Sequence, residues 1–461
     1  MINVTEILSL KDIKVIGAFP NDLKGFSGCS IDSRKIKKDE LFIAIKGDNT
    51  DGHNYLKAVF DKGVRAAIVN DKWLKKNKAG FKGKTLFAVR DTIKSLGELA
   101  KIHKNRFGIP VICLGGSNGK TSTKDMTAHL LSGKYNLLYS EGNLNNHLGL
   151  PLTLLKMNSK HNLCLLEAGS NHFNELEYLC GIAEPDYALV TNIGREHLEF
   201  FKDLNGVAKE EFTLYDYVRK SGGVCFANLD DDYIRKYFIK KKCFSYAYTR
   251  NADVKGVFRG YTKLFNPMIE VAYKDGNFKI VIPTFGKHSV YNGLAAISVA
   301  LYFGMKPVEI KKQMKTYEPE VSQRMQLIKT NNFLIINDAY NSNPDSVKLG
   351  LETIAEFGTK GRKHIVIADM LEMGKKSTEA HQEVGRLVRK LGFRNLYTYG
   401  KASYHIFRNA GRLENNFHFK DKYELAELLK RVVRKGDLIY FKASRGMKLE
   451  DVISELIKNK I

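Results

Sequence analysis

A glycine-containing turn at residues 116–121 separates an apolar, strand-like run from a helix-like run. Glycines let backbone N–H groups approach phosphate oxygens, and the start of the following helix adds partial positive charge. Lys120 would then neutralise the β- and γ-phosphates of a nucleotide, while the hydroxyl of Thr121 would reach a metal ion. The spacing is G-x-x-G-K-T, shorter than the usual GxxxxGK[ST], because Leu114 stands six positions before Lys120. The turn predicts a phosphate-binding loop.

Two further polar residues follow strand-like runs. Glu167 lies near the end of the apolar run at 162–169, and His197 follows the run at 187–194. In open α/β sheets, ligands bind beyond the carboxyl ends of the strands, so both residues should lie at the edge that carries the phosphate loop. A carboxylate and an imidazole are candidate metal ligands there. The competing interpretation is an ordinary surface residue, and it is stronger for His197 than for Glu167.

The elements that must position these residues fall into three regions. Residues 1–107 mix short strands and turns and end in an amphipathic helix at 91–107. Residues 108–317 alternate near-continuous apolar strands with helices, as a mainly parallel sheet does. Residues 318–461 repeat that alternation. We therefore predict an α/β protein of three domains: a small N-terminal α/β domain, a central P-loop domain with a mainly parallel sheet, and a C-terminal doubly wound, Rossmann-like domain.

Composition limits the class of protein. The six cysteines are scattered without a CxxC pair, which argues against a disulfide-stapled fold. No run of about 18 apolar residues occurs, and the first residues lack the pattern of a signal peptide. We therefore expect no membrane span and a cytoplasmic location.

The net charge of +24 leaves three interpretations open. It could reflect a lysine-rich solvated surface, a field that attracts phosphorylated substrates, or a nucleic-acid partner. The basic residues are spread along the chain, and no RNA-binding or zinc-finger signature accompanies them. We therefore expect no nucleic-acid partner.

Eight further segments accompany the turn in a defined order. They are residues 30–56, 142–155, 166–171, 191–201, 290–301, 337–347, 368–374 and 442–450. Together with GSNGKTSTK, they resemble the Mur ligases of peptidoglycan synthesis over nearly the whole chain. The segment SIDSRKIKKDELFIAIKGDNTDGHNYL at 30–56 is similar to the part of the family that binds the uridine nucleotide.

The resemblance implies an ATP-dependent ligase that uses Mg²⁺. ATP would phosphorylate the carboxylate of a UDP-sugar peptide, and an amine would then displace phosphate from the acyl phosphate to form an amide. The last three segments point within the family to UDP-N-acetylmuramoyl-tripeptide and D-alanyl-D-alanine as the substrates. We accordingly expect residues 1–107 to bind the UDP-sugar, residues 108–317 to bind ATP and residues 318–461 to complete the ligase site, in a monomer.

The resemblance also implies roles for individual residues. The residues expected to bind ATP are Gly116, Ser117, Asn118, Gly119, Lys120, Thr121, Ser122, Asn292, Arg324 and Asp338. Thr121, Glu167 and His197 would hold or neighbour the metal, and Lys120, Glu167, His197 and Glu211 would be catalytic. The residues expected to contact the substrates are Ser33, Arg34, Asn146, Tyr340, Asn341 and Asn343.

One departure from the family concerns its carbamylated lysine, which usually follows the histidine by about 14 residues. That position holds Glu211 here, and the nearest lysine, Lys209, should point elsewhere because two helical positions amount to a turn of roughly 200°. A carbamylated lysine is an anionic carboxylate on a long stem. We hypothesise that Glu211 supplies this charge near a second metal. The competing interpretation is a surface glutamate beside a weak second site.

Two more departures, His147 and the sequence LEFF after His197, lie near the expected metal and γ-phosphate. They leave open a divergent Mur-type ligase with a different amine acceptor. Two further hypotheses are a carboxylate–amine ligase such as a folylpolyglutamate synthetase, and a non-enzymatic nucleotide-binding or nucleic-acid-binding module. Lysine and diaminopimelate are both candidates for the third residue of the peptide.

Overall fold

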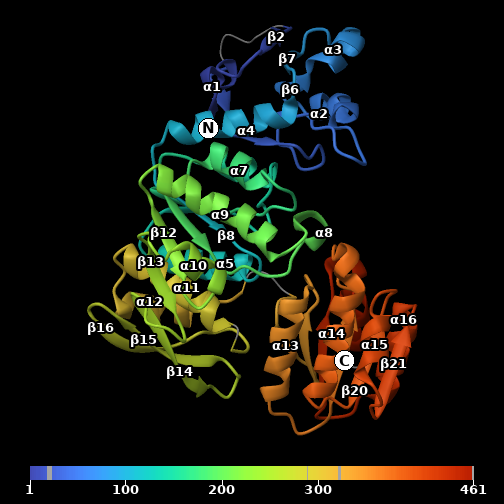
Figure 1. The fold of residues 1–461 in the computed structure, drawn as a ribbon. Helices are drawn as coiled ribbons and strands as arrows, with labels where there is room; N and C mark the ends of the chain where they lie inside the picture. The colour runs from blue at the N-terminus through green and yellow to red at the C-terminus, as the bar shows by residue number, and fades with distance from the viewer. Residues whose placement is uncertain (18–22, 288, 320–322, 459–461) are drawn as a thin grey trace.

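The structure, a computed structural model, describes residues 1–17, 23–287, 289–319 and 323–458. It contains three large sheets with flanking helices, in the order of the three predicted regions (Figure 1). The predicted α/β class is therefore confirmed. The predicted boundaries, after residues 107 and 317, remain a proposal; they fall in segments that connect one sheet-bearing region to the next.

The N-terminal region has a five-stranded sheet of order β2-β7-β6-β5-β4 and a two-stranded sheet, β1-β3. Within the larger sheet only β2 and β7 pair antiparallel. The strands are β1 (Ile2–Asn3), β2 (Lys14–Ile16), β3 (Gly25–Phe26), β4 (Gly28–Ser30), β5 (Glu40–Ile43), β6 (Ala66–Asn70) and β7 (Thr85–Val89). The helices are α1 (Val4–Leu8), η1 (Gly52–Tyr55), α2 (Leu56–Asp61), α3 (Asp71–Asn77), η2 (Lys78–Phe81) and α4 (Thr92–Asn105).

The central region has a nine-stranded sheet of order β16-β15-β14-β13-β12-β11-β8-β10-β9. Its strands are β8 (Val111–Gly115), β9 (Leu137–Tyr139), β10 (Leu163–Glu167), β11 (Tyr187–Val190), β12 (Val224–Asn228), β13 (Phe244–Ala247), β14 (Val254–Tyr261), β15 (Pro267–Tyr273) and β16 (Gly276–Val281). Its helices are α5 (Lys120–Leu131), α6 (Gly149–Leu154), α7 (Glu175–Ala183), α8 (Leu198–Phe201), α9 (Leu204–Lys220), α10 (Asp232–Tyr237), α11 (Ser289–Tyr302) and α12 (Pro307–Lys315). The antiparallel pairs β14–β15 and β15–β16 were not predicted.

The C-terminal region has a six-stranded sheet of order β17-β18-β22-β19-β20-β21, in which only β17 runs antiparallel to its neighbour. Its strands are β17 (Gln326–Lys329), β18 (Leu334–Asp338), β19 (Lys363–Ala368), β20 (Asn395–Tyr399), β21 (Asn415–Phe419) and β22 (Leu438–Lys442). Its helices are α13 (Pro344–Glu356), η3 (Gly374–Lys376), α14 (Ser377–Lys390), α15 (Tyr404–Ala410), α16 (Lys422–Val432), η4 (Arg445–Met447) and α17 (Glu450–Lys458).

The position of β8 inside the central sheet explains why its sequence is continuously apolar. It lies between β10 and β11, and all five of its residues are buried. Val111 and Cys113 belong to one hydrophobic cluster, while Ile112 and Leu114 belong to the cluster on the other face of the sheet. A strand that is covered on both faces has no polar side, and it holds the start of the phosphate loop rigidly in place.

The three regions meet around the carboxyl edge of the central sheet. Helix α4 lies between the N-terminal sheet and α7, and α8 projects toward the upper end of α14 (Figure 1). Gly97 of α4 permits the close packing of α4 against α7, because a Cβ there would lie 2.7 Å from Cδ1 of Ile182 in α7. In the part of the chain that the structure describes, no helix is both long and apolar enough to span a bilayer.

Candidate active site

The predicted phosphate loop connects β8 directly to α5, and two of its glycines are required by its shape. Gly116 and Gly119 have φ values of +111° and +80°, in the left-handed region that side-chain-bearing residues avoid. A Cβ on Gly116 would lie 2.2 Å from Oγ1 of Thr191, and one on Gly119 would lie 2.3 Å from Oδ1 of Asn292. The loop therefore closely approaches both the neighbouring strand end and Asn292, one of the residues expected to bind ATP.

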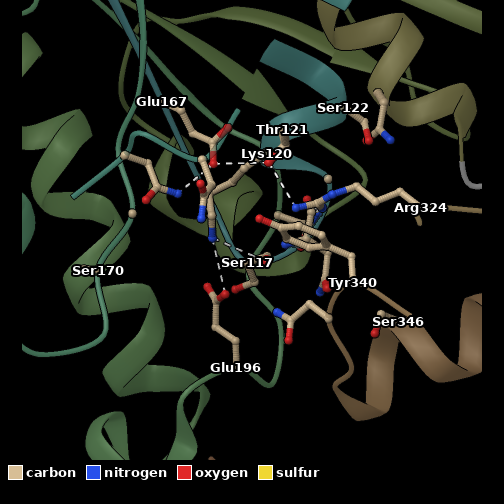
Figure 2. Close-up of a pocket in the computed structure, with 18 of the residues that line it drawn as sticks. Ser117, Lys120, Thr121, Ser122, Glu167, Ser170, Glu196, Arg324, Tyr340 and Ser346 are labelled. Atoms are coloured by element: carbon tan, nitrogen blue, oxygen red, sulfur yellow. Dashed lines mark hydrogen bonds and ion pairs between the residues drawn. The ribbon is translucent and has the colours of Figure 1, made fainter. Parts of the chain in front are cut away.

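Lys120, the first residue of α5, is held by polar atoms around the loop (Figure 2). Its Nζ lies 3.3 Å from Oε2 of Glu196 and also contacts the carbonyl oxygen of Gly116. Burial acts to lower the pKa of Lys120, but the carboxylates of Glu196, Glu211 and Glu167 outweigh it and raise the pKa. Lys120 is thus a charged ammonium at the place expected for β- and γ-phosphates.

Glu196 was not among the predicted site residues. It is 5% exposed and lines the same cavity as Lys120. Its position, one residue before His197 and beyond the end of β11, was the only indication in the sequence. The structure thus adds a buried carboxylate on the lysine side of the site.

Thr121 and Glu167 come together as predicted for a metal site. Oγ1 of Thr121 donates to Oε1 of Glu167 at 3.3 Å, and Nδ2 of Asn145 donates to the same oxygen at 2.8 Å. The other carboxylate oxygen of Glu167 is buried and, among the described residues, has no hydrogen-bond partner. A hydroxyl and a free carboxylate oxygen are the hard ligands that Mg²⁺ takes, so these residues fit that ion.

The side chain of Asn146, which the resemblance places in contact with the substrates, is hydrogen-bonded within its own loop. Asn146 lines the cavity, but its Oδ1 accepts from the backbone N–H groups of Leu148 and Gly149, at 3.1 Å and 2.9 Å, in the turn that leads into α6. Asn145, which the sequence reasoning passed over, reaches Glu167 instead. The side chains of the two adjacent asparagines thus point in different directions.

His197 lies on the wall of the cavity but is turned toward the C-terminal region. Its Nδ1 lies 2.5 Å from Oε2 of Glu372, a residue that precedes η3. Among the described residues, no group of three His, Cys, Asp or Glu side chains is arranged to hold a metal. The structure therefore brings Thr121 and Glu167 together and leaves His197 in an interdomain contact.

Glu211 of α9 lies against the phosphate loop rather than at the surface. It is 2% exposed, and its Oε2 accepts from the backbone N–H of Gly116 at 2.6 Å. Burial, together with repulsion by Glu196, raises its pKa to about 8, although Lys120 acts in the opposite direction. The side chain is therefore positioned to add negative charge behind the phosphate loop when it is ionised.

A cavity of about 1040 Å³ joins the central and C-terminal regions around these residues. On its central side it is lined by Ser117, Asn118, Gly119, Lys120, Thr121, Ser122, Glu167, His197 and Asn292. On its C-terminal side it is lined by Arg324, Asp338, Tyr340, Asn341 and Lys442. Asp91 and Lys94, at the start of α4, extend the lining toward the N-terminal region. One cavity thus borders all three parts of the chain.

The C-terminal side chains form their own network at the cavity wall. Nη2 of Arg324 donates to Oγ1 of Thr121 at 3.1 Å, and its guanidinium lies 4.4 Å from the ring centre of Tyr340. Asp338 is held by Nζ of Lys442 at 2.8 Å and by the hydroxyl of Tyr440 at 3.1 Å. Of the two predicted residues, Arg324 therefore reaches the phosphate-loop side, whereas Asp338 lines the same cavity with its bonds inside the C-terminal region. Lys442 is an unpredicted cation beside them.

The two predicted asparagines of the segment 341–343 differ in position. Asn341 lines the cavity, whereas Asn343 caps α13 by accepting from the N–H of Ser346 at 2.8 Å. Nδ2 of Asn343 also donates to Oδ1 of Asn118 at 2.9 Å. Asn343 thus links the C-terminal region directly to the phosphate loop.

Ser33 and Arg34 lie in the N-terminal region and do not line the large cavity. The guanidinium of Arg34 makes two hydrogen bonds of 2.9 Å to the carboxylate of Asp32. Nζ of Lys62 donates to the carbonyl oxygens of Ser33 and Arg34, at 2.7 Å and 3.0 Å. Local contacts therefore hold the loop that contains Ser33 and Arg34.

Three family profiles match successive parts of the chain. The Mur ligase family, catalytic domain, matches residues 25–103, and the Mur ligase middle domain matches residues 114–300. The Mur ligase, glutamate ligase domain, matches residues 323–445. The matches follow the order of the three sheets.

Curated relatives and solved structures agree with these matches. The UDP-N-acetylmuramoyl-tripeptide--D-alanyl-D-alanine ligase of Bacillus subtilis (strain 168) is 32% identical over 94% of this chain and 93% of its own length. The ligase of the same name from Escherichia coli (strain K12) is 29% identical over 93% of each chain. MurF from Acinetobacter baumannii superposes with a TM-score of 0.83 at 26% identity, covering 93% of both chains.

A more distant structure, MurF ligase from Thermotoga maritima in complex with ADP, shares the fold, with a TM-score of 0.82 at 24% identity over 94% of this chain and 97% of the other. The phosphate loop, the buried carboxylates around it and the cavity shared with the C-terminal region fit the chemistry of nucleotide-dependent ligation. The chain therefore belongs to the Mur ligase family and is an ATP-dependent ligase.

Proposed function

We propose that this ligase joins D-alanyl-D-alanine to the free carboxylate of UDP-N-acetylmuramoyl-tripeptide, in the synthesis of peptidoglycan precursors. The observation that carries the proposal is the full-length similarity to ligases of that name, 32% identical in the Bacillus subtilis relative. The shared cavity supports it, because phosphate-loop residues face C-terminal residues across one space. A ligase needs this arrangement, since its nucleotide and its two substrates must meet.

The chemistry begins with a carboxylate, which is a poor electrophile. Transfer of the γ-phosphoryl group of ATP to that carboxylate gives an acyl phosphate and ADP. Lys120 and the N-terminus of α5 are placed to stabilise the charge on the transferring group. Thr121 and Glu167 would hold Mg²⁺, which when bound would supply neutralising charge at the phosphates.

The second half of the reaction forms the amide. The amine of D-alanyl-D-alanine attacks the acyl carbon and forms the C–N bond. The nitrogen then loses a proton, and the tetrahedral intermediate breaks its C–O bond to release inorganic phosphate and leave the amide. We propose that Tyr340, Asn341 and Asn343 position the amine or the reacting carboxylate from the C-terminal side. Ser33 and Arg34 would contact the uridine diphosphate portion from the N-terminal region.

The test is release of phosphate by the purified protein with ATP, Mg²⁺, UDP-N-acetylmuramoyl-tripeptide and D-alanyl-D-alanine, with each component omitted in turn. The expected result is release that requires both peptide substrates, with one amide formed per phosphate. Release that needs the UDP-sugar but a different amine would replace the acceptor in this proposal. No release with any UDP-sugar, despite binding of ATP, would overturn the assignment of both substrates.

The proposal includes two properties of the protein in the cell. We propose that it acts in the cytoplasm, where ATP and nucleotide-linked precursors are available, and that it does so as a monomer. Light scattering on the eluting peak of a size-exclusion column, at several protein concentrations, tests the second property. A mass that is twice that of the 52.2 kDa chain would contradict it.

A further inference from the structure

The loop at 191–197, between β11 and α8, is hydrogen-bonded to the phosphate loop. Oδ1 of Asn192 accepts from the backbone N–H of Asn118 at 3.1 Å, and Oγ of Ser117 accepts from the N–H of Gly194 at 2.8 Å. Gly194 allows this approach, since a Cβ there would lie 2.8 Å from Nδ2 of Asn118. A shift of this loop would therefore displace the phosphate loop as well.

The same loop reaches the C-terminal region through Arg195. Its backbone N–H donates to Oδ2 of Asp345 at 2.7 Å, and its Nε donates to Oδ1 of the same carboxylate at 3.0 Å. Its Nη1 lies 2.6 Å from Oε2 of Glu383. Asp345 is in the first turn of α13 and Glu383 is in α14, so one arginine ties two C-terminal helices to the central region.

Two neighbouring contacts complete the connections among the phosphate loop, the loop at 191–197 and the start of α13. Asn343, the N-cap of α13, donates to Asn118 of the phosphate loop. Glu196, the residue after Arg195, pairs with Lys120 at the other end of that loop. The first turn of α13, the loop at 191–197 and the phosphate loop are thus each bonded to the other two.

We propose that Arg195, with Asp345 and Glu383, is a positioning clamp that sets the C-terminal region against the phosphate loop during ligation. None of these three side chains lines the large cavity, so they act through the residues beside them and not on substrate. An arginine that donates in a fixed fork to two carboxylates is directional, and three charges in a network hold better than an isolated pair. Such a contact defines an orientation as well as an attraction.

The clamp matters for the reaction because the acyl phosphate is sensitive to water. The C-terminal residues that face the phosphate loop must remain in place until the amine has attacked. A clamp that opens too readily leaves the intermediate exposed, so that water competes with the amine. Loss of the clamp should therefore release phosphate without forming amide, and this uncoupling differs from a simple loss of folded protein.

The first test compares Arg195→Gln with the wild type, and its kinetic part rests on the proposed function. We expect kcat for amide formation to fall at least ten-fold, the ratio of phosphate to amide to rise above one, and KM for ATP to change less than three-fold. Asp345→Asn should behave alike, and the double variant should be no worse than either single variant. Arg195→Lys should restore part of the coupling.

A matched control is Arg259→Gln, since Arg259 of β14 pairs with Glu270 of β15 at 2.7 Å and neither residue belongs to the clamp. This variant should keep both kcat and the ratio of phosphate to amide. A one-to-one ratio in Arg195→Gln, or additive effects of the Arg195 and Asp345 substitutions, would overturn the clamp.

A second measurement does not depend on the identity of the substrates. Small-angle X-ray scattering should give a larger radius of gyration for Arg195→Gln than for the wild type and Arg259→Gln, because fewer contacts then hold the C-terminal region against the central one. Equal radii would overturn the clamp even if the substrates proved to be different. Absence of amide formation by the wild type, together with a larger radius in the variant, would instead reject the proposed substrates and retain the clamp.

Discussion

Lys120 and Glu196 form an ion pair of 3.3 Å on the wall of the cavity, where the phosphates of ATP are expected. The two residues come from different elements, the start of α5 and the loop that follows β11. The ammonium group of Lys120, which is expected to bind the γ-phosphate, is therefore already paired with the buried carboxylate of Glu196. Binding of a nucleotide must compete with this pair.

Replacement of Glu196 by Gln should strengthen the binding of ATP in the absence of divalent metal. The substitution removes a like charge from the phosphate site and frees Lys120, and we expect an affinity gain of about three- to ten-fold, or roughly 1 kcal/mol. Titration calorimetry in EDTA measures it. Glu177→Gln, an exposed position on α7, is the control and should not change the affinity. An unchanged or weaker affinity in Glu196→Gln would show that the pair does not oppose phosphate.

Replacement of Glu167 by Gln should abolish most of the ligase turnover. Glu167 presents a buried oxygen without a hydrogen-bond partner among the described residues, and an amide at this position cannot supply the negative charge that Mg²⁺ requires. We expect kcat to fall by about 10²–10³-fold, as when a group that stabilises transition-state charge is removed. Steady-state kinetics across a Mg²⁺ titration checks this. Asn145→Ala, which removes only a neighbour of Glu167, should cost less, and equal losses would argue against a metal role.

Glu211 should make stability depend on pH. Its pKa of about 8 lies above the ordinary value of 4.5, so between these two pH values the folded protein retains a proton that the unfolded chain has released. Stability then falls as pH rises across this window. Thermal melts in EDTA should show a declining midpoint for the wild type and a flatter profile for Glu211→Gln. Parallel profiles would contradict the raised pKa.

The same variant tests the hypothesis that Glu211 supplies the charge of the family's carbamylated lysine. If it does, Glu211→Gln should lower turnover and weaken the dependence on Mg²⁺. The position of Glu211 favours a role at the phosphate loop, because its carboxylate binds the N–H of Gly116. Turnover and Mg²⁺ dependence equal to those of the wild type would reject the hypothesis.

Elements with strong periodicity or strong backbone requirements are predictable from the sequence. The phosphate loop was predictable because glycines, a lysine and a buried strand occur together, and the structure confirms the strand β8 and the helix α5 at this place. The hairpin strands β14 to β16 were missed. Their residues alternate between buried and half-exposed positions and include charged residues such as Arg259 and Glu270, so they lack the continuous apolar runs of parallel strands.

Contacts between residues that are far apart in the sequence could not be predicted. Glu196, Asn145 and Lys442 belong to the site only because three strand ends and a domain junction meet there. The direction of side chains could not be predicted either: His197, expected near the metal, faces Glu372, and Asn146, expected to contact the substrates, bonds to the turn before α6. A motif specifies which residues approach the site, while packing decides which atoms face it.

The stacked pair Arg324 and Tyr340 leads to a final prediction on ATP binding. The guanidinium of Arg324 lies 4.4 Å from the ring centre of Tyr340 and donates to Thr121, so the ring orients a cation toward the phosphate loop. Tyr340→Ala should raise KM for ATP by about three- to ten-fold, as expected for loss of a cation–π contact of roughly 1 kcal/mol. Tyr340→Phe keeps the ring face and should leave this KM near the wild-type value. If Phe raised KM for ATP as much as Ala does, the hydroxyl and not the ring would be the group that matters, and Tyr340 would act on a ligand directly instead of through Arg324.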